Sequence, residues 1–195
     1  VAAKRFIVED AIYDQFRDAY LEQMKQITFG DPTQKETVMG PMARKDLRDG
    51  LHEQVRKSVD NGATCLLGGE IPEGKGCFYP ATVLENVAPG QPAYDEELFG
   101  PVASLIRVKD AEEAMKVAND SPYGLGGGIF SQNEARAIEM AREEFDTGMV
   151  NINGYNLAQP NLPFGGVKES GYGREHGGFG MHEFVNVKSV MITES

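Results

Sequence analysis

The chain has 195 residues and a mass of 21.3 kDa, which is enough for one large domain or for a domain with an appendage. Thirty Asp and Glu residues against nineteen Lys and Arg residues give a net charge of −11 and a pI near 4.8. This acidic balance argues against general binding to nucleic acids or to anionic membranes, because both are negatively charged. We therefore expect neither nucleic acid nor a membrane among its partners.

The cysteines and histidines form no recognisable metal-ligand pattern. Cys65 and Cys77 are not arranged as C-x-x-C, and the three histidines are scattered along the chain. We expect two reduced, structural thiols, as is usual in a cytosolic protein. No apolar run is long enough to span a bilayer and no signal-peptide pattern is present, so the expected location is the cytoplasm.

The first third of the chain predicts a strand followed by two amphipathic helices. Residues 4–9 (K-R-F-I-V-E) are typical of a short strand, and helices are expected over residues 10–27 and 43–61. Turn residues predict an irregular loop over residues 29–42, and Gly62 is placed to end the second helix in the left-handed conformation. The predicted buried stripes are Ile12, Phe16, Tyr20, Met24 and Ile27 in the first helix, and Leu47, Leu51, Val55 and Val59 in the second.

Two short strands are expected next, over residues 64–67 and 78–84. The second contains Pro80, which cannot donate a ladder hydrogen bond. We therefore expect this strand to lie at an edge of its sheet.

From Ser104 onward the pattern is regular and predicts an α/β fold. Strands are expected over residues 104–108, 126–130 and 149–153, separated by one helix over residues 110–119 and another over residues 131–145. Strands joined through helices by short connections predict parallel pairing with right-handed crossovers. The expected helix starts are marked by capping pairs, Asp110 with Glu113 and Ser131 with Glu134.

Both ends of the chain indicate that it is incomplete by itself. Phe184 to Thr193 (F-V-N-V-K-S-V-M-I-T) predicts a strand, and an isolated terminal strand needs a partner, often in another subunit. The chain opens with Val1 and leads directly into an apolar strand pattern. We expect a fragment of a longer protein.

Residues 161–177 (N-L-P-F-G-G-V-K-E-S-G-Y-G-R-E-H-G) are dense in glycine. A chain keeps glycine at this density where its backbone turns with positive φ or passes close to another group. The glycines are separated by larger residues such as Phe164, Lys168, Arg174 and Glu175, which is unlike a Gly/Ser linker. The segment predicts either a surface loop that only joins two strands or a loop that shapes a pocket.

Two adjacent carboxylates, Glu96 and Glu97, precede a Phe-Gly-Pro sequence. Most such pairs are solvated surface, but a glutamate held there could also accept hydrogen bonds from the vicinal hydroxyls of a ribose. Phe99 could then pack on a nicotinamide or ribose face. The chain has no dinucleotide fingerprint, Walker A loop, zinc-protease motif or nucleophile elbow, and no evident nucleophile or general base.

Four ordered motifs resemble the C-terminal half of the NAD(P)-dependent aldehyde dehydrogenases. They are E-E-L-F-G-P-V at 96–102, N-D-S-P-Y-G-L at 119–125, G-M-V-N-I-N-G-Y at 148–155 and P-F-G-G-V-K-E-S-G-Y-G-R-E at 163–175. The opening V-A-A-K-R-F-I-V is most similar to bacterial succinate-semialdehyde dehydrogenases. The resemblance implies an α/β fold with a parallel-stranded, three-layer catalytic domain over residues 1–180 and an oligomerisation strand over residues 181–195.

The resemblance also implies roles for individual residues. Glu97 matches the glutamate that binds the nicotinamide ribose, and Phe99 matches the aromatic residue beside it. Glu175 matches a buried carboxylate near the catalytic centre, where a structural partnership with Arg174 or a backbone amide is as good an interpretation as proton relay. The positions that match the aldehyde tunnel are Val1 at its floor and Asn156, Leu157, Ala158 and Phe164 in its loop.

The family's nucleophilic cysteine lies in a G-Q-x-C stretch directly before the position that Val1 matches, so the resemblance places it outside this chain. Neither Cys65 nor Cys77 falls at that position. The implied reaction begins when a thiolate attacks an aldehyde to give a thiohemiacetal. Hydride then passes to NAD or NADP, and activated water hydrolyses the thioester. The chain by itself is then expected to be inactive.

The implied partners are a small-molecule aldehyde and further copies of the chain. If the substrate is a semialdehyde with a carboxylate, its anchor must come mainly from elsewhere, because residues 153–161 contain no Lys or Arg. The competing interpretation is a non-catalytic α/β module, kept for subunit assembly or as a pseudo-enzyme.

Overall fold

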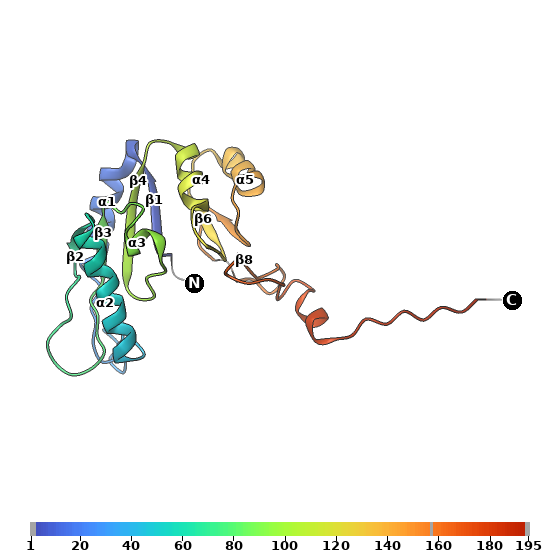
Figure 1. Cartoon of the computed structure of the whole chain (residues 1–195), viewed down its shortest axis with the longest axis horizontal. Helices are drawn as coiled ribbons and strands as arrows, with labels where there is room; N and C mark the ends of the chain where they lie inside the picture. Colours follow the sequence, from blue (N-terminus) through green and yellow to red (C-terminus); the bar gives the residue numbers. More distant parts are fainter. Residues whose placement is uncertain (1–2, 157, 194–195) are drawn as a thin grey trace. The chain divides into compact units, whose positions relative to one another are not determined.

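The computed structural model describes residues 3–156 and 158–193 and contains two compact units (Figure 1). Among the described residues, the first unit comprises 3–117 and the second comprises 118–156 and 158–193. The division falls within α4 (Ala111–Asn119).

The first unit is built on a four-stranded sheet with the order β1-β4-β3-β2. Its strands are β1 (Arg5–Glu9), β2 (Thr64–Leu67), β3 (Thr82–Glu85) and β4 (Val102–Val108). β4 is parallel to both β1 and β3, and β2 is antiparallel to β3.

The expected edge position of the third strand is wrong. β3 begins at Thr82 and lies between β4 and β2, in the interior of the sheet. Pro80 precedes the ladder, so its missing N–H places no constraint on the position of the strand.

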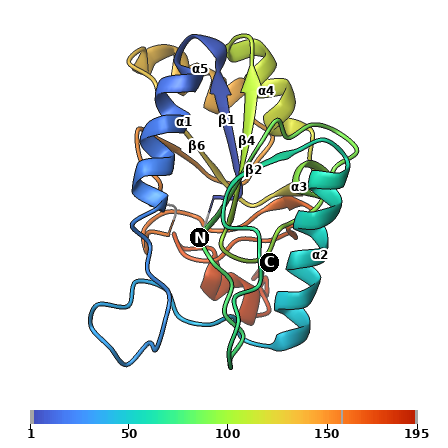
Figure 2. The same cartoon turned by 90° about the vertical axis from the view of Figure 1, so that its left-hand side faces the viewer.

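Helices cover both faces of this sheet, which makes the first unit three layers thick. Figure 2 shows α1 (Asp10–Met24) on one side of the strands and α2 (Lys45–Asp60) on the other. The short α3 (Pro92–Asp95) packs on the same face as α2. The mixed α/β architecture with parallel strands that the sequence predicts is confirmed.

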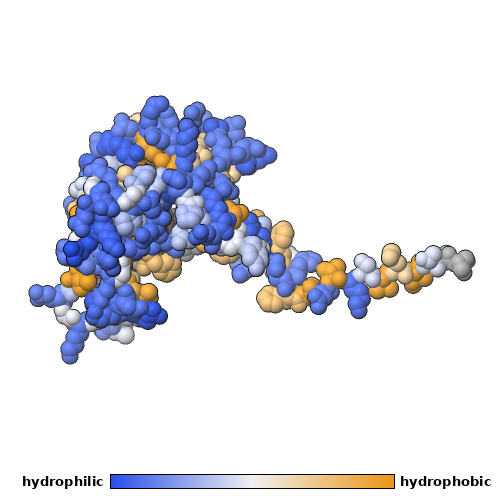
Figure 3. All heavy atoms as spheres, in the orientation of Figure 1, coloured by the Kyte–Doolittle hydropathy of each residue, from blue (hydrophilic) through white to orange (hydrophobic). Residues whose placement is uncertain are grey.

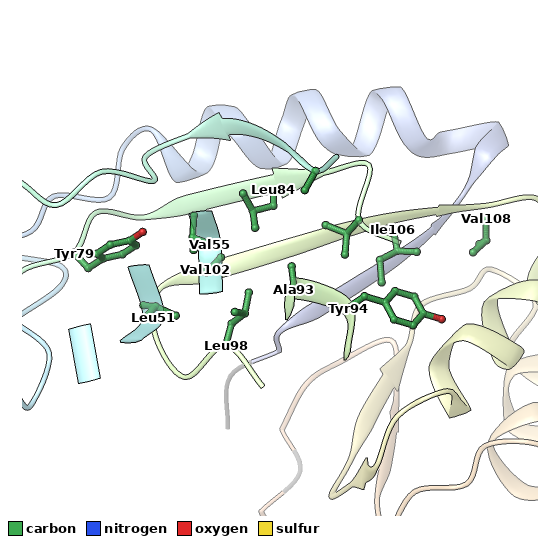
Figure 4. Packing of buried hydrophobic residues seen from close by; sticks show 12 residues of the cluster. Leu51, Val55, Tyr79, Leu84, Ala93, Tyr94, Leu98, Val102, Ile106 and Val108 are labelled. Carbon is green, nitrogen blue, oxygen red and sulfur yellow. The ribbon is translucent and has the colours of Figure 1, made fainter. Parts of the chain in front are cut away.

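The alternation of side chains along the strands divides the core between the two faces. Val83 and Leu105 pack with α1 in one cluster. The other cluster joins β3 and β4 to α2 and α3 (Figure 4). Its labelled members are Leu51, Val55, Tyr79, Leu84, Ala93, Tyr94, Leu98, Val102, Ile106 and Val108.

The predicted buried stripe of α1 is wrong at its start. Ile12 is 56% exposed, whereas Tyr13 is only 2% exposed and packs against the guanidinium of Arg107, 4.1 Å from its ring. A strict four-residue spacing advances about 40° per step around a helix of 3.6 residues per turn. Phe16 and Tyr20 face the core, but the same spacing places Ile12 on a side of the helix that is turned away from it. Ile27 lies beyond the end of α1.

The same rotation affects α2. Leu51 and Val55 are buried as expected, but Leu47 and Val59 are exposed. Ser58 is buried instead, where its Oγ donates to the Gln54 carbonyl at 2.8 Å and accepts from the Ala93 amide at 2.9 Å. Beyond the helix, Gly62 has φ of +107°, which confirms the predicted left-handed termination.

One of the two predicted capping pairs is confirmed. The Asp110 carboxylate accepts from the Glu113 amide at 3.0 Å, and the Glu113 carboxylate accepts from the Lys109 amide at 2.6 Å. The cap of α5 (Glu134–Glu143) is Asn133 instead of Ser131. Ser131 binds the Asn133 amide and so lies one turn ahead of the helix.

The second unit contains two small strand pairs. β6 (Gly127–Ile129) and β7 (Val150–Ile152) are parallel and flank α5 in the sequence, as predicted. β5 (Tyr123–Gly124) and β8 (Val167–Lys168) are antiparallel.

The expected C-terminal strand is not formed within this chain. A 3₁₀ helix, η1, spans Gly180–Phe184, and the described residues after it, 185–193, have no regular secondary structure. Apolar side chains of this segment lie in the open, including Val187, Met191 and Ile192 (Figure 3).

Three further observations concern the described residues only. Cys65 and Cys77 are free thiols. No group of three or more His, Cys, Asp or Glu residues is arranged to hold a metal ion. None of the helices is both long enough and apolar enough to cross a membrane.

The face of α1 that packs on the core can be tested with two adjacent residues. Tyr13→Ala should lower the free energy of unfolding by about 3 kcal/mol, because it leaves a cavity under Arg107. Ile12→Ala should change it by less than about 0.5 kcal/mol, because that side chain is mostly in water. Urea unfolding of the two variants measures both values, and equal losses of stability would contradict the burial of Tyr13 and the exposure of Ile12.

Candidate functional site

The chain leaves α3 through a tight turn that separates neighbouring side chains. Leu98 is 1% exposed and belongs to the core, whereas Phe99 is 75% exposed. The Gly100 amide donates to the Leu98 carbonyl at 2.9 Å, and the Val102 amide donates to the Gly100 carbonyl at 2.8 Å. Such i to i+2 hydrogen bonds are typical of γ-turns and fix the backbone locally. Glu97 and Phe99 are therefore held on a rigid backbone with their side chains exposed.

Glycine is required at position 100 because the turn lies directly against α2. A Cβ atom there would overlap a methyl group of Leu51, and it would lie 3.4 Å from the terminal carbon of Met42. Leu51 is itself buried, so it has little room to move away. This close approach fixes the distance between the turn and α2.

The structure distinguishes the two adjacent carboxylates. The Gln54 amide of α2 donates to the Glu96 carboxylate at 2.7 Å. The Glu97 carboxylate is exposed, and among the described residues it has no hydrogen bond or ion pair. Glu97 is thus the carboxylate that is available to a ligand.

Lys4 contacts this turn from the start of β1 and was not identified from the sequence. Its ammonium donates to the Gly100 carbonyl at 2.8 Å and lies 5.9 Å from the centroid of the Phe99 ring. Burial lowers the pKa of Lys4, and attraction to Glu97 opposes that shift. The two contact partners are 96 positions apart, so no local signal could have found the pairing.

In the second unit the glycine-rich segment is ordered by contacts of its own. The backbones of Phe164 and Glu175 form an antiparallel bridge with hydrogen bonds of 2.8 and 2.7 Å. Arg174 donates to the carbonyls of Gly166 at 2.7 Å and Gly173 at 2.6 Å. The segment is therefore a folded loop and not a flexible linker.

A backbone-to-backbone contact fixes this loop against the start of β7. A Cβ atom at Gly148 would overlap the carbonyl oxygen of Gly165 and lie 2.9 Å from the Gly166 Cα. The Gly148 amide also donates to the Gly124 carbonyl at 3.0 Å. No side-chain rearrangement can relieve a clash with backbone, so only glycine fits at position 148.

The expected burial of Glu175 is wrong for this chain. Its side chain is exposed, and Arg174 binds carbonyl groups instead of pairing with it. Asn156 and Ala158 are exposed, and Phe164 is half-buried beside His176, with ring centroids 5.8 Å apart. The other two residues expected in the aldehyde tunnel, Val1 and Leu157, lie outside the described residues.

The model of the aldehyde dehydrogenase family matches residues 1–190. The chain belongs to the aldehyde dehydrogenase family. This confirms the family that the four sequence motifs indicate.

Two similar relatives are bacterial proteins. The Escherichia coli protein called succinate semialdehyde dehydrogenase [NAD(P)+] Sad is 49% identical over 189 residues, which cover 97% of this chain and 41% of that protein. The succinate-semialdehyde dehydrogenase [NADP(+)] of Mycobacterium avium is 45% identical, over 100% of this chain and 41% of that protein.

A solved structure has the same fold. The succinic semialdehyde dehydrogenase from Streptococcus pyogenes, determined in complex with NADP+, superimposes with a TM-score of 0.93 at 40% identity. The match covers 98% of this chain and 42% of that structure. The chain thus spans about two-fifths of the length of the relatives that it matches.

The exposed face of the turn suits part of a nicotinamide nucleotide. An unpaired carboxylate at Glu97 can accept two hydrogen bonds from vicinal ribose hydroxyls, and the accessible ring of Phe99 offers an apolar surface to a flat group. These residues fit the cofactor that the family implies.

The contact at Gly148 leads to a test of the loop. Gly148→Ala should lower the free energy of unfolding by about 1–3 kcal/mol, because the new methyl group overlaps fixed backbone. Gly50→Ala is a matched control, since a Cβ atom there meets nothing within 4 Å inside α2. It should raise that energy by about 0.5–1 kcal/mol. Denaturant unfolding compares the two, and a neutral Gly148→Ala would contradict the close approach.

Proposed function

We propose that this chain is part of the catalytic domain of an NAD(P)-dependent aldehyde dehydrogenase, an oxidoreductase that converts succinate semialdehyde to succinate. The observation that carries the proposal is the Glu97–Phe99 turn, in which a free carboxylate and an exposed ring lie on a rigid backbone. Membership of the family supports the reaction type, and the names of the relatives support the substrate.

In this proposal Glu97 accepts hydrogen bonds from the nicotinamide ribose, and Phe99 packs beside it. The nucleotide, when bound, accepts a hydride from the substrate. The contribution of the turn is orientation, because a fixed geometry lowers the entropic cost of bringing the reacting atoms together.

The nucleophile is a cysteine that directly precedes Val1 in the intact protein, and it attacks the aldehyde to give a thiohemiacetal. Cys65, one of the two free cysteines of this chain, is poorly suited to that task. Burial raises the pKa of the Cys65 thiol, which reduces the fraction of reactive thiolate at neutral pH.

The second unit supplies the wall of the aldehyde tunnel. Asn156, Ala158 and the half-buried Phe164 are accessible to a ligand. The family resemblance adds Leu157 to this loop and Val1 to the floor of the tunnel. Glu175 has either a role in proton relay or a structural role, and its exposed side chain does not pair with Arg174. Because residues 153–161 contain no cationic side chain, the carboxylate of the semialdehyde is anchored from outside this segment.

Assembly is the second part of the proposal. The exposed apolar residues after η1 are an unpaired segment that can add to the sheet of a neighbouring subunit. Residues 181–195 then serve oligomerisation, and residues 1–180 form the catalytic portion. If the intact protein has no enzymatic activity, the exposed apolar segment after η1 favours the competing interpretation, a non-catalytic module for subunit assembly.

The proposed activity is tested on the intact protein that contains this chain. Succinate semialdehyde with NAD+ or NADP+ should give NAD(P)H, detected by its absorbance, together with succinate. The 195-residue chain by itself is the control, and it should give none because the nucleophile is missing. Absence of NAD(P)H with a panel of aldehydes from intact protein would refute the activity.

The assignment of Glu97 is tested against its neighbour. Glu97→Gln in the intact protein should lower kcat/KM for the cofactor about tenfold or more, because a charged acceptor of two hydrogen bonds becomes a neutral one. Glu96→Gln keeps an acceptor for Gln54 and should change kcat/KM less than about twofold. Equal effects in steady-state kinetics would remove Glu97 from the site.

A further inference from the structure

We propose that Lys4 is a positioning residue, which holds the Glu97–Gly100 turn in the orientation that binds the nicotinamide nucleotide. The inference rests on the proposed function, because that function makes Glu97 and Phe99 the contacts to the cofactor. Lys4 acts through the Gly100 carbonyl and the Phe99 ring, and it has no assigned contact with the cofactor itself.

Lys4 is tied to the site by both its main chain and its side chain. Its carbonyl accepts from the Ser104 amide at 3.0 Å, which anchors the residue to β4 just after the turn. Its ammonium then reaches back to Gly100 at 2.8 Å. The side chain therefore spans the turn from a fixed point directly before the neighbouring strand β1.

The other restraints on the turn come from the core and from α2. Leu98 is buried, Gly100 lies against Leu51, and Glu96 is bound by Gln54 of α2. These contacts fix the backbone but leave Glu97 and Phe99 exposed. Among the described residues, the ammonium of Lys4 is the cation that touches this exposed side.

The charges around Lys4 favour this bridge over a solvated position. The half-buried ammonium loses hydration, and a carbonyl oxygen, an aromatic face and the nearby Glu97 carboxylate compensate for part of that loss. Removal of the charge should free the Gly100 carbonyl and the Phe99 ring without opening the core beneath Leu98.

Two substitutions in the intact protein separate the charge from the packing. Lys4→Met keeps the apolar stem and loses the ammonium, and Lys4→Arg keeps a cation that can donate to the Gly100 carbonyl. Lys75→Met is the control, since Lys75 is exposed on the connection between β2 and β3. The measurements are the Kd for NAD(P)+ by titration, KM for cofactor and aldehyde, and deuterium exchange of residues 96–102 without cofactor.

Lys4→Met should raise the Kd and the KM for NAD(P)+ about three- to tenfold, which corresponds to about 0.7–1.4 kcal/mol, the size of a typical net hydrogen bond. The KM for the aldehyde should stay within about twofold. Exchange over residues 96–102 should become faster, and exchange in β4 beyond Ser104 should not change. Lys4→Arg should restore most of the cofactor affinity, and Lys75→Met should match the parent protein.

Unchanged cofactor affinity in Lys4→Met would refute the inference. So would faster exchange across the whole first unit, since that would make Lys4 a general structural residue. Failure of the proposed function is distinguishable, because the unsubstituted protein would then neither bind NAD(P)+ nor form NAD(P)H. In that case unchanged exchange over residues 96–102 in Lys4→Met would still refute the restraint on the turn.

Discussion

The parallel pairing of β1 with β4 is the contact on which the first unit depends. It aligns Arg5 with Ser104 and Glu9 with Val108, and so joins the beginning of the chain to its middle. β3 pairs with the other edge of β4, and helices cover both faces of this interior strand. Because the turn at Glu97–Gly100 leads directly into β4, its position is set by this sheet.

Much of the fold could be predicted from local patterns, because helix and strand periodicity are properties of neighbouring residues. The failures occurred where tertiary packing decides. A four-residue spacing of apolar residues predicts neither the burial of Tyr13 in place of Ile12 nor the burial of Ser58. The interior position of β3 depends on which strands pair, and Pro80 proved uninformative because it lies outside the ladder.

The candidate site was predictable only in part. The motif around Glu97 predicted a site at this turn, but only the hydrogen bond from Gln54 explains why Glu97 and not Glu96 is free. Lys4 joins that turn from 96 positions away, a relation that no local pattern contains. The exposure of Glu175 has a similar origin, since burial depends on what packs around a side chain and not on its own motif.

Both glycine-dependent contacts follow one physical rule. At Gly100 the backbone lies against a buried leucine, and at Gly148 it lies against the backbone of the glycine-rich loop. In each case the absence of a Cβ atom lets a loop approach a packed element closely, and close packing limits its movement. A binding loop needs such rigidity because its exposed side chains have few contacts of their own. Glycine is the residue with the greatest conformational freedom in the unfolded chain. At these two positions it nevertheless makes the folded loops rigid, because it lets them pack closely against their neighbours.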